Sequence, residues 1–343
     1  MKIVLSKSQK RIIVIVISFS VGYYIWHVNY DIFGNTFRTC FILSTTTFLL
    51  IFTPFEIYFS FRDIWFKRWN SIQTNCIKIE KVKIKIGETK KKKKPKFLSA
   101  DLIFPKNKEE THLKNAIIIV SHGFSDTKFT LQYYYLPLVY NGYVVLAYDA
   151  RGIGKSKRAG NRNQFILRIQ DFKNIIEWIK NDQSLNKMKI YCVGFSIGAI
   201  TVLSGGFLNE NIRKIIAVSS ISNYKQNIPK HNLVVLLSYS IKGVKMFPNK
   251  DENFLLSPYL IMEKAKKTFS KDTWEKLAKR VMLIHSRNDK VVKLKNFLEN
   301  KEILDTPQEL QLLFNKGGHS LKKNELSLVG ASLSYFNSKS FYP

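Results

Sequence analysis

Six short apolar runs recur between residues 116 and 314, and they constrain the fold more than any other feature of the chain. Most of them are separated by segments with the apolar spacing of an amphipathic helix, such as residues 167–181 and 290–303. Strands that alternate with helices form a mostly parallel sheet with helices on both faces. The six predicted strands are residues 116–121, 143–148, 189–194, 214–219, 281–285 and 309–314.

Two further strands are predicted ahead of these six. Residues 77–86, IKIEKVKIKI, alternate apolar and charged side chains, which is typical of a strand with one solvated face. Residues 97–105, FLSADLIFP, are its predicted hairpin partner. We therefore predict an α/β domain over residues 76–340 with a mostly parallel, eight-stranded sheet. Residues 223–280 hold no clear strand, and we predict that they form a partly helical cap inserted into this domain, with the apolar piece NLVVLLSYSIKGVKMF inside it.

Two apolar stretches, residues 12–28 and 39–55, precede this domain. Each is near the lower limit of the ~17–25 residues that span a bilayer. Lys and Arg flank the outer ends of the pair, which favours a helical hairpin in residues 1–70 with both ends, and the following domain, in the cytoplasm. One span followed by a buried helix is an alternative. A cleaved signal peptide is another, although the first stretch lacks a convincing small-residue cleavage site.

The cysteines and the absence of other motifs limit the kinds of site. Cys40, Cys76 and Cys192 are widely spaced and form no CxxC pair. This spacing argues against a disulfide framework or a zinc site and favours a reducing compartment. The sequence shows no metal-ligand cluster, phosphate-binding glycine loop or haem motif. We therefore expect neither a metal nor a cofactor.

The positive charge of the chain is uneven. The formal net charge is +30, and residues 62–96 alone carry 13 basic and 3 acidic residues. A lysine run in such a region is usually a solvated loop, and its best functional interpretation is adhesion to anionic lipid beside the membrane segment. Nucleic acid is disfavoured as a partner because no aromatic residues are interleaved with the lysines. The run consists of Lys90, Lys91, Lys92, Lys93 and Lys94.

Ser196 lies in the stretch GFSIG, after the predicted strand 189–194 and before the apolar segment IGAITVLSGG. A nucleophilic serine on a strand-to-helix turn needs small residues two positions before and after it, here Gly194 and Gly198. The turn also places the hydroxyl at a helix N-terminus, where negative charge is favoured. An ordinary helix-start serine is the alternative interpretation.

A nucleophilic serine needs a base, and the base needs an orienting acid. His319 lies in GGHS, directly after the last predicted strand, and is the candidate base. Asp289 follows the strand 281–285 and is the candidate acid, although a turn or N-cap aspartate is the alternative. Asp305 and Glu302 come near the end of the next helix and so are expected to point away from the carboxyl edge of the sheet.

The order serine, aspartate, histidine at the carboxyl ends of successive strands is expected of α/β-hydrolases. The chain from about residue 76 to 340 resembles that superfamily. Within it, the chain is similar to the serine hydrolases grouped with serine aminopeptidases, monoglyceride lipases and membrane-tethered α/β-hydrolase-domain proteins. Besides GFSIG, the resemblance rests on SHGF at 121–124, YDARGIGKS at 148–156, HSRNDKVV at 285–292 and GGHS at 317–320.

The resemblance implies an oxyanion hole made by two backbone N–H groups, those of Phe124 and Ile197. Phe124 follows the pair His122 and Gly123, and the glycine lets the backbone approach closely. Two fixed N–H dipoles would stabilise the tetrahedral intermediate by about 2.7–4 kcal/mol per donor. The resemblance also implies that Asp149 and Arg151 have structural roles.

Together these patterns predict a membrane-anchored serine hydrolase that cleaves an acyl ester through an acyl-enzyme intermediate. A membrane hairpin and an apolar cap favour a lipid-derived ester, although ordinary core packing also explains an apolar cap. Two alternatives remain open: a serine peptidase of the aminopeptidase type, and a non-catalytic membrane-surface binding protein on the same fold.

Overall fold

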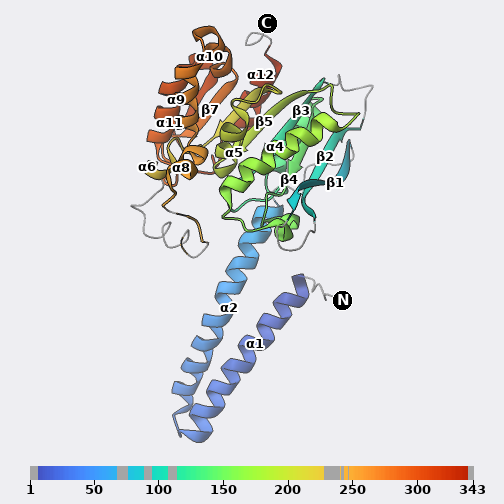
Figure 1. The fold of residues 1–343 in the computed structure, drawn as a ribbon. Helices are drawn as coiled ribbons and strands as arrows, with labels where there is room; N and C mark the ends of the chain where they lie inside the picture. The colour runs from blue at the N-terminus through green and yellow to red at the C-terminus, as the bar shows by residue number, and fades with distance from the viewer. Residues whose placement is uncertain are drawn as a thin grey trace. The chain divides into compact units, whose positions relative to one another are not determined.

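A computed structural model describes residues 7–67, 76–88, 95–106, 114–227, 240, 243–245 and 247–338. The chain divides into two compact units, Met1–Gln73 and Thr74–Pro343 (Figure 1). The lysine run at residues 90–94 lies outside the described residues, and so does most of the apolar piece 232–247.

The first unit consists of two long helices, α1 (Lys7–His27) and α2 (Phe37–Lys67), joined through a short π-helical turn, Val28–Ile32 (Figure 1). Both are long and apolar enough to cross a membrane by length and composition, over Arg11–Ile32 and Phe37–Phe59, each with a mean hydropathy of 1.7. These candidate spans extend beyond the two predicted stretches at both ends.

The two helices of this unit contact each other at both polar and small residues. The hydroxyl of Ser44 donates to the carbonyl of Gly22 at 2.8 Å. The Arg11 guanidinium forms an ion pair with Glu56 at 2.6 Å near the other ends of the helices. Most other side chains of the pair are apolar and exposed.

The second unit contains an eight-stranded sheet in the order β1-β2-β4-β3-β5-β6-β7-β8 (Figure 1). The first two strands form an antiparallel hairpin, β2 is antiparallel to β4, and all other neighbours are parallel. The prediction of a mostly parallel, eight-stranded sheet is confirmed. The strands are β1 (Ile77–Glu88), β2 (Pro95–Pro105), β3 (Ala116–Ser121), β4 (Val144–Tyr148), β5 (Lys189–Phe195), β6 (Ile212–Val218), β7 (Val281–Ser286) and β8 (Gln311–Phe314).

Helices connect most of these strands, as the alternating pattern predicts. One of them, α3, was not expected from the sequence, because its residues QYYYLPLVY are apolar on every side and include Pro137. The helices in the described part of this unit are α3 (Gln132–Tyr140), α4 (Phe165–Asn181), α5 (Ile197–Gly206), α6 (Tyr224–Asn227), α8 (Lys250–Leu256), α9 (Pro258–Thr268), α10 (Lys271–Ala278), α11 (Leu294–Leu304) and α12 (Glu325–Asn337).

Alternate residues of the central strands face two helical layers. Ile117 and Ile215 belong to a buried core with side chains of α4, α5, α9, α10 and α11. On the opposite face Tyr191 of β5 stacks on Phe336 of α12, with ring centroids 5.3 Å apart, and α3 packs beside α12. This two-sided burial explains why the central strands are apolar runs without a polar alternation.

The described part of residues 223–280 divides between two environments. Met262 of α9 and Trp274 of α10 are buried in the same core as the central strands. Tyr224 of α6 and Leu256 of α8 belong instead to a separate apolar cluster. The predicted cap interval is therefore helical in its described part, and its second half is a layer on the sheet.

Candidate active site

Ser196 occupies the turn between β5 and α5, with φ of 55° and ψ of −116°. This conformation is sparsely populated by residues other than glycine and costs of order 1–3 kcal/mol. Two backbone hydrogen bonds hold it: the Ser196 N–H donates to the carbonyl of Val218, and the Ser196 carbonyl accepts from the N–H of Ala199, both at 2.9 Å. Sheet and helix together fix the turn and so the place of the hydroxyl.

The two glycines of GFSIG are required by close contacts with backbone atoms, since neither has a positive φ. A Cβ on Gly194 would lie 2.2 Å from the carbonyl oxygen of Gly198, at the start of α5. A Cβ on Gly198 would lie 2.1 Å from the carbonyl oxygen of Ser121, at the end of β3. Neither contact is possible for a real side chain, so both positions need glycine for the turn to close.

The structure brings together the three side chains that the sequence singled out. The Nε2 atom of His319 lies 2.9 Å from the Oγ of Ser196, and its Nδ1 atom lies 2.8 Å from the Oδ2 of Asp289. Asp289 is on the turn after β7, and its other oxygen accepts hydrogen bonds from the N–H groups of Val291 and Val292 at 2.8 and 2.9 Å. Both oxygens of the carboxylate therefore have hydrogen-bond partners that fix its orientation.

The charge of Asp289 follows from its surroundings. Burial raises the pKa of this carboxyl, but the hydrogen bond and charge of His319 and the N–H groups of Val292 and Val291 outweigh burial, so the pKa lies below its ordinary value. An ionised Asp289 accepts a hydrogen bond from the Nδ1–H group of His319. The Nε2 atom is then unprotonated and faces the serine hydroxyl, as a general base requires.

A second histidine beside this group has a different role. The ring of His285 is buried, and its Nε2 lies 2.9 Å from the carbonyl of Val292 and 3.9 Å from Asp289 Oδ2. Burial lowers the pKa of His285, against the charge of Asp289. A neutral ring whose Nε2–H donates to the Val292 carbonyl supports the Asp289 turn and leaves the Asp289 carboxylate to the hydrogen bond from His319.

His122, predicted to support the oxyanion turn, joins the ends of two strands. Its Nδ1 donates to the carbonyl of Gly123 at 2.7 Å, and its Nε2 accepts from the N–H of Ala150 at 2.9 Å. Burial, with a smaller contribution from Arg168, lowers the pKa of His122 to about 3. The ring is neutral and fully hydrogen-bonded, so its role is structural.

The two predicted oxyanion donors lie on segments that border Ser196. A Cβ on Gly123 would lie 3.7 Å from the Cβ of Ser196, which places the turn that carries Phe124 against the serine. Ile197 is the first residue of α5, where backbone N–H groups have no partner within the helix. Their role as donors to an oxyanion remains a prediction.

The contacts of Asp149 and Arg151 agree with the structural roles implied for them. The Asp149 carboxylate accepts from the backbone N–H of Lys128 at 3.0 Å and of Lys155 at 2.9 Å. The Arg151 Nε donates to the buried carboxylate of Asp171 at 2.7 Å. These bonds hold the loop after β4 in place beside the site.

Sequence reasoning missed one acidic residue, Asp126, in the same turn as Phe124. Its Oδ2 lies 2.6 Å from the position that a Cβ on Gly123 would occupy, and the carboxylate hydrogen-bonds to the Gly123 backbone and to Thr130. Burial raises the pKa of Asp126, against the Thr130 hydrogen bond and the charge of His319. The signal in the sequence was an acid two residues beyond the predicted oxyanion donor.

An apolar cluster borders the site on the side of the inserted segment. Phe124 packs edge-to-face on Phe165, with ring centroids 5.6 Å apart. Both residues are joined in the cluster by side chains from α5 and from the region around α6 and α8. Its buried members are Phe124, Phe165, Ile169, Ile197, Ile200, Ile221, Tyr224, Val244, Leu256 and Val292.

Comparison with known proteins gives a family match and curated relatives. Residues 113–257 match the model of a serine aminopeptidase family, S33. A 31.7 kDa protein of Escherichia coli, from the traX-finO intergenic region, is 25% identical over 113 residues, which make up 32% of this chain. The matched part spans only 38% of the length of that relative.

Solved structures resemble the chain over about three quarters of its length. An acylaminoacyl peptidase of Pyrococcus horikoshii has a TM-score of 0.52 at 17% identity and covers 78% of this chain and 41% of that one. An acylaminoacyl peptidase in complex with Z-Gly-Gly-Phe-chloromethyl ketone has a TM-score of 0.53 at 18% identity, with coverages of 77% and 42%. At such identities these likenesses show a shared fold.

Proposed function

We propose that this member of the α/β-hydrolase superfamily is a serine hydrolase that cleaves an acyl ester. Ser196 is the nucleophile, His319 the general base and Asp289 the acid that orients it. The observation that carries the proposal is the pair of hydrogen bonds made by His319, 2.9 Å to Ser196 Oγ and 2.8 Å to Asp289 Oδ2. Three such groups in contact have little use outside nucleophilic catalysis.

The proposed reaction has two halves. As Ser196 Oγ attacks the substrate carbonyl, His319 Nε2 takes the hydroxyl proton, and the N–H groups of Phe124 and Ile197 stabilise the oxyanion. The intermediate collapses to an acyl-enzyme, and His319 gives its proton to the leaving alcohol. A water molecule then attacks the acyl-enzyme with the same base, which regenerates Ser196 and releases the acid.

The apolar cluster supports an ester with an apolar acyl group. Phe124 and Ile197, which carry the proposed oxyanion donors, belong to the same buried cluster as Tyr224 and Leu256 of the inserted segment. Apolar side chains at this position favour the burial of an alkyl chain next to the reacting carbonyl. A lipid-derived ester, such as a monoacylglycerol or a lysophospholipid, fits this chemistry.

A serine peptidase of the aminopeptidase type is the second candidate, and the family match over residues 113–257 supports it. Acyl-chain profiling separates the two. An esterase should hydrolyse p-nitrophenyl esters with a preferred chain length and leave peptide amides uncleaved. A peptidase should release the N-terminal residue from short peptides more efficiently than it cleaves any of the esters.

Membrane anchoring by the first unit is also part of the proposal. Its support is the length and apolar composition of α1 and α2. We propose a helical hairpin with the hydrolase domain on the cytoplasmic side, and the run Lys90–Lys94 as a contact with anionic lipid. A membrane anchor would place the site near esters that partition into the bilayer.

Labelling with a fluorophosphonate tests the nucleophile directly. The purified full-length protein should be labelled at Ser196, and the Ser196→Ala variant should lose both labelling and esterase activity. Ser125→Ala is the matched control, because Ser125 is exposed in the turn next to Phe124 and is given no role. Undiminished activity of Ser196→Ala would reject the proposal.

A further inference from the structure

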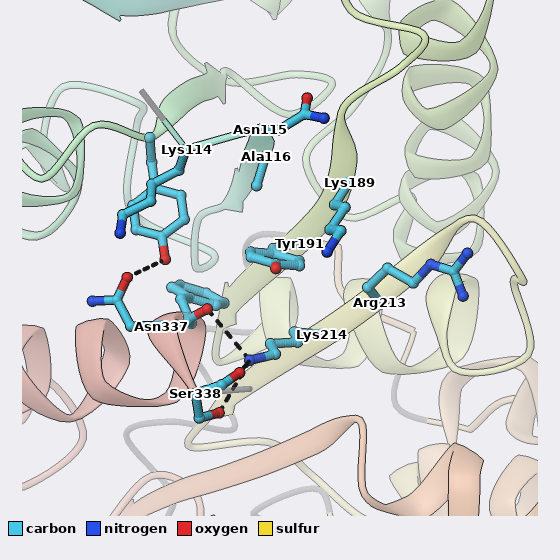
Figure 2. Close-up of a pocket in the computed structure, with 11 residues that line it drawn as sticks. Lys114, Asn115, Ala116, Lys189, Tyr191, Arg213, Lys214, Asn337 and Ser338 are labelled. Atoms are coloured by element: carbon cyan, nitrogen blue, oxygen red, sulfur yellow. Dashed lines mark hydrogen bonds between the residues drawn. The ribbon is translucent and has the colours of Figure 1, made fainter. Parts of the chain in front are cut away.

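A cavity of about 670 Å³ lies at the edge of the sheet formed by the amino ends of its parallel strands, and Figure 2 shows the residues that line it. Its walls come from residues at or just before the amino ends of β3, β5 and β6 and from the end of α12. Lys189 is the first residue of β5, whereas Ser196 follows the last residue of that strand. The cavity and the proposed active site therefore lie at opposite ends of β5.

The lining of this cavity is strongly basic. It includes the cations Lys114, Lys189, Arg213 and Lys214, and no aspartate or glutamate. Lys114, Lys189 and Arg213 are exposed. Among the residues that the structure describes, none of the four cations forms an ion pair with a carboxylate. In the described part of the chain, no carboxylate therefore offsets their positive charge.

Lys214 differs from the other three because it is buried and fixed. Its ammonium donates to the carbonyl of Tyr335 at 2.6 Å and to the carbonyl of Ser338 at 2.7 Å. Burial, with the charge of Lys189, lowers the pKa of Lys214 to about 8. The ammonium therefore ties the end of α12 to β6 and makes a rigid floor for the cavity.

Aromatic rings complete this floor. Tyr191 stacks on Phe336 with an interplanar angle of 9°, and the Lys214 ammonium lies 5.7 Å from the centroid of the Tyr191 ring. In Figure 2 the Tyr191 ring lies among the side chains of Lys189, Arg213 and Lys214. The cavity is therefore lined by three exposed cationic side chains and by a pair of stacked aromatic rings.

We propose that this cavity is a binding site for an organic phosphate with two or more negative charges. Several cations around one cavity, with no carboxylate partner in the described residues, raise the local concentration of anions. Arg213 offers the planar, bidentate donors that match phosphate oxygens, and Lys114 and Lys189 supply point charges. A monocarboxylate, such as a fatty acid, would leave most of this positive charge uncompensated. The site is independent of the chemistry proposed at Ser196.

Two sources supply this ligand chemistry: the headgroup of a phosphorylated lipid and a soluble phosphate ester. The full-length protein in neutral detergent micelles can be titrated calorimetrically with inositol hexakisphosphate and, separately, with a water-soluble dioctanoyl phosphatidylinositol phosphate. Tighter binding of the lipid analogue would identify a headgroup site, and tighter binding of the hexakisphosphate would identify a soluble ligand.

The double variant Lys189→Ala/Arg213→Ala tests the location. It should weaken binding of the better probe by about tenfold or more. The matched control is Lys83→Ala/Lys173→Ala, which removes the same charge from exposed positions on β1 and α4 and should change the affinity less than about threefold. Equal loss in both double variants, no loss in either, or no binding of either probe to the unmodified protein would overturn the proposal.

Discussion

The backbone of Gly198 lies directly against the carbonyl oxygen of Ser121, 2.1 Å from where a Cβ would be placed. Gly198 belongs to the turn of the proposed nucleophile, and Ser121 is the last residue of β3, one position before His122. The close approach brings the turn that carries Phe124 next to Ser196. Any side chain at position 198 must therefore push these two segments apart.

This contact predicts that Gly198→Ala destabilises the domain. Overpacking against backbone that cannot move aside should lower the free energy of unfolding by at least about 2 kcal/mol. Denaturant unfolding of the detergent-solubilised protein measures the change. Gly330→Ala is the control, since nothing lies within 4 Å of the Cβ position at this residue of α12. It should raise stability by about 0.5–1 kcal/mol, and equal effects of both variants would contradict the prediction.

Asp289→Asn should lower kcat about 10³- to 10⁴-fold with little change in KM, because the amide no longer fixes the tautomer of His319. Steady-state hydrolysis of a short p-nitrophenyl ester is the measurement. Asp305→Asn is a matched control, because Asp305 is one of the two other acidic residues considered from the sequence. Asp305 ends α11 with φ of 48°, a conformation that asparagine also adopts. A comparable loss in Asp305→Asn would argue against the assignment of Asp289.

The buried His122 should make the domain sensitive to acid. Its pKa is about 3 in the folded protein against 6.5 for the unperturbed side chain. The unfolded chain therefore binds a proton that the folded chain does not, and stability falls as pH decreases from 6.5 towards 3. The slope from this one residue is about 1.4 kcal/mol per pH unit.

The variant His122→Gln isolates this contribution, because the amide oxygen can still accept from the Ala150 N–H. Chemical denaturation at pH 6 and pH 4.5 should show a smaller acid-induced loss of stability in the variant than in the unmodified protein. Identical slopes would show that His122 is not the group responsible.

Asp126 should have the opposite effect on stability. Burial raises its pKa above the ordinary value of 3.8, so the unfolded chain loses its proton first and stability falls as pH rises from about 3.8 through the raised pKa. Asp126→Asn should therefore be more stable than the unmodified protein at pH 7, and the difference should shrink in acid. A variant less stable at pH 7 would contradict this sign.

Cys76 offers a direct test of the topology of the first unit. It is the exposed cysteine of the three, whereas Cys40 and Cys192 are buried. A membrane-impermeant maleimide should leave Cys76 unlabelled in intact cells and label it after permeabilisation, if the hydrolase domain is cytoplasmic. In the double variant Cys76→Ser/Phe33→Cys, the new cysteine is at an exposed position in the connection between α1 and α2 and should be labelled in intact cells without permeabilisation.

The strands and the serine turn could be predicted because their signals are local. Residues 116–121 and 281–286 are buried on both faces of a parallel sheet, so they are apolar without interruption. Gly194 and Gly198 flank the serine because the turn leaves no space for a side chain. Asp289 and His319 were found because strand ends in a parallel sheet share one edge.

The remaining features depend on which distant segments pack together. The helix α3 contains Pro137 and no amphipathic spacing, and it is formed in a buried layer beside α12. The position of Asp126 also depends on the fold, which places its carboxylate next to Gly123 and near His319. The basic cavity joins Lys114, just before β3, with Lys189 of β5 and Arg213 of β6. The succession of strands along the chain and the residue types at their ends follow from the sequence, because burial of a strand leaves a local apolar pattern. The distances between segments follow from the fold alone, because they depend on packing across the whole sheet.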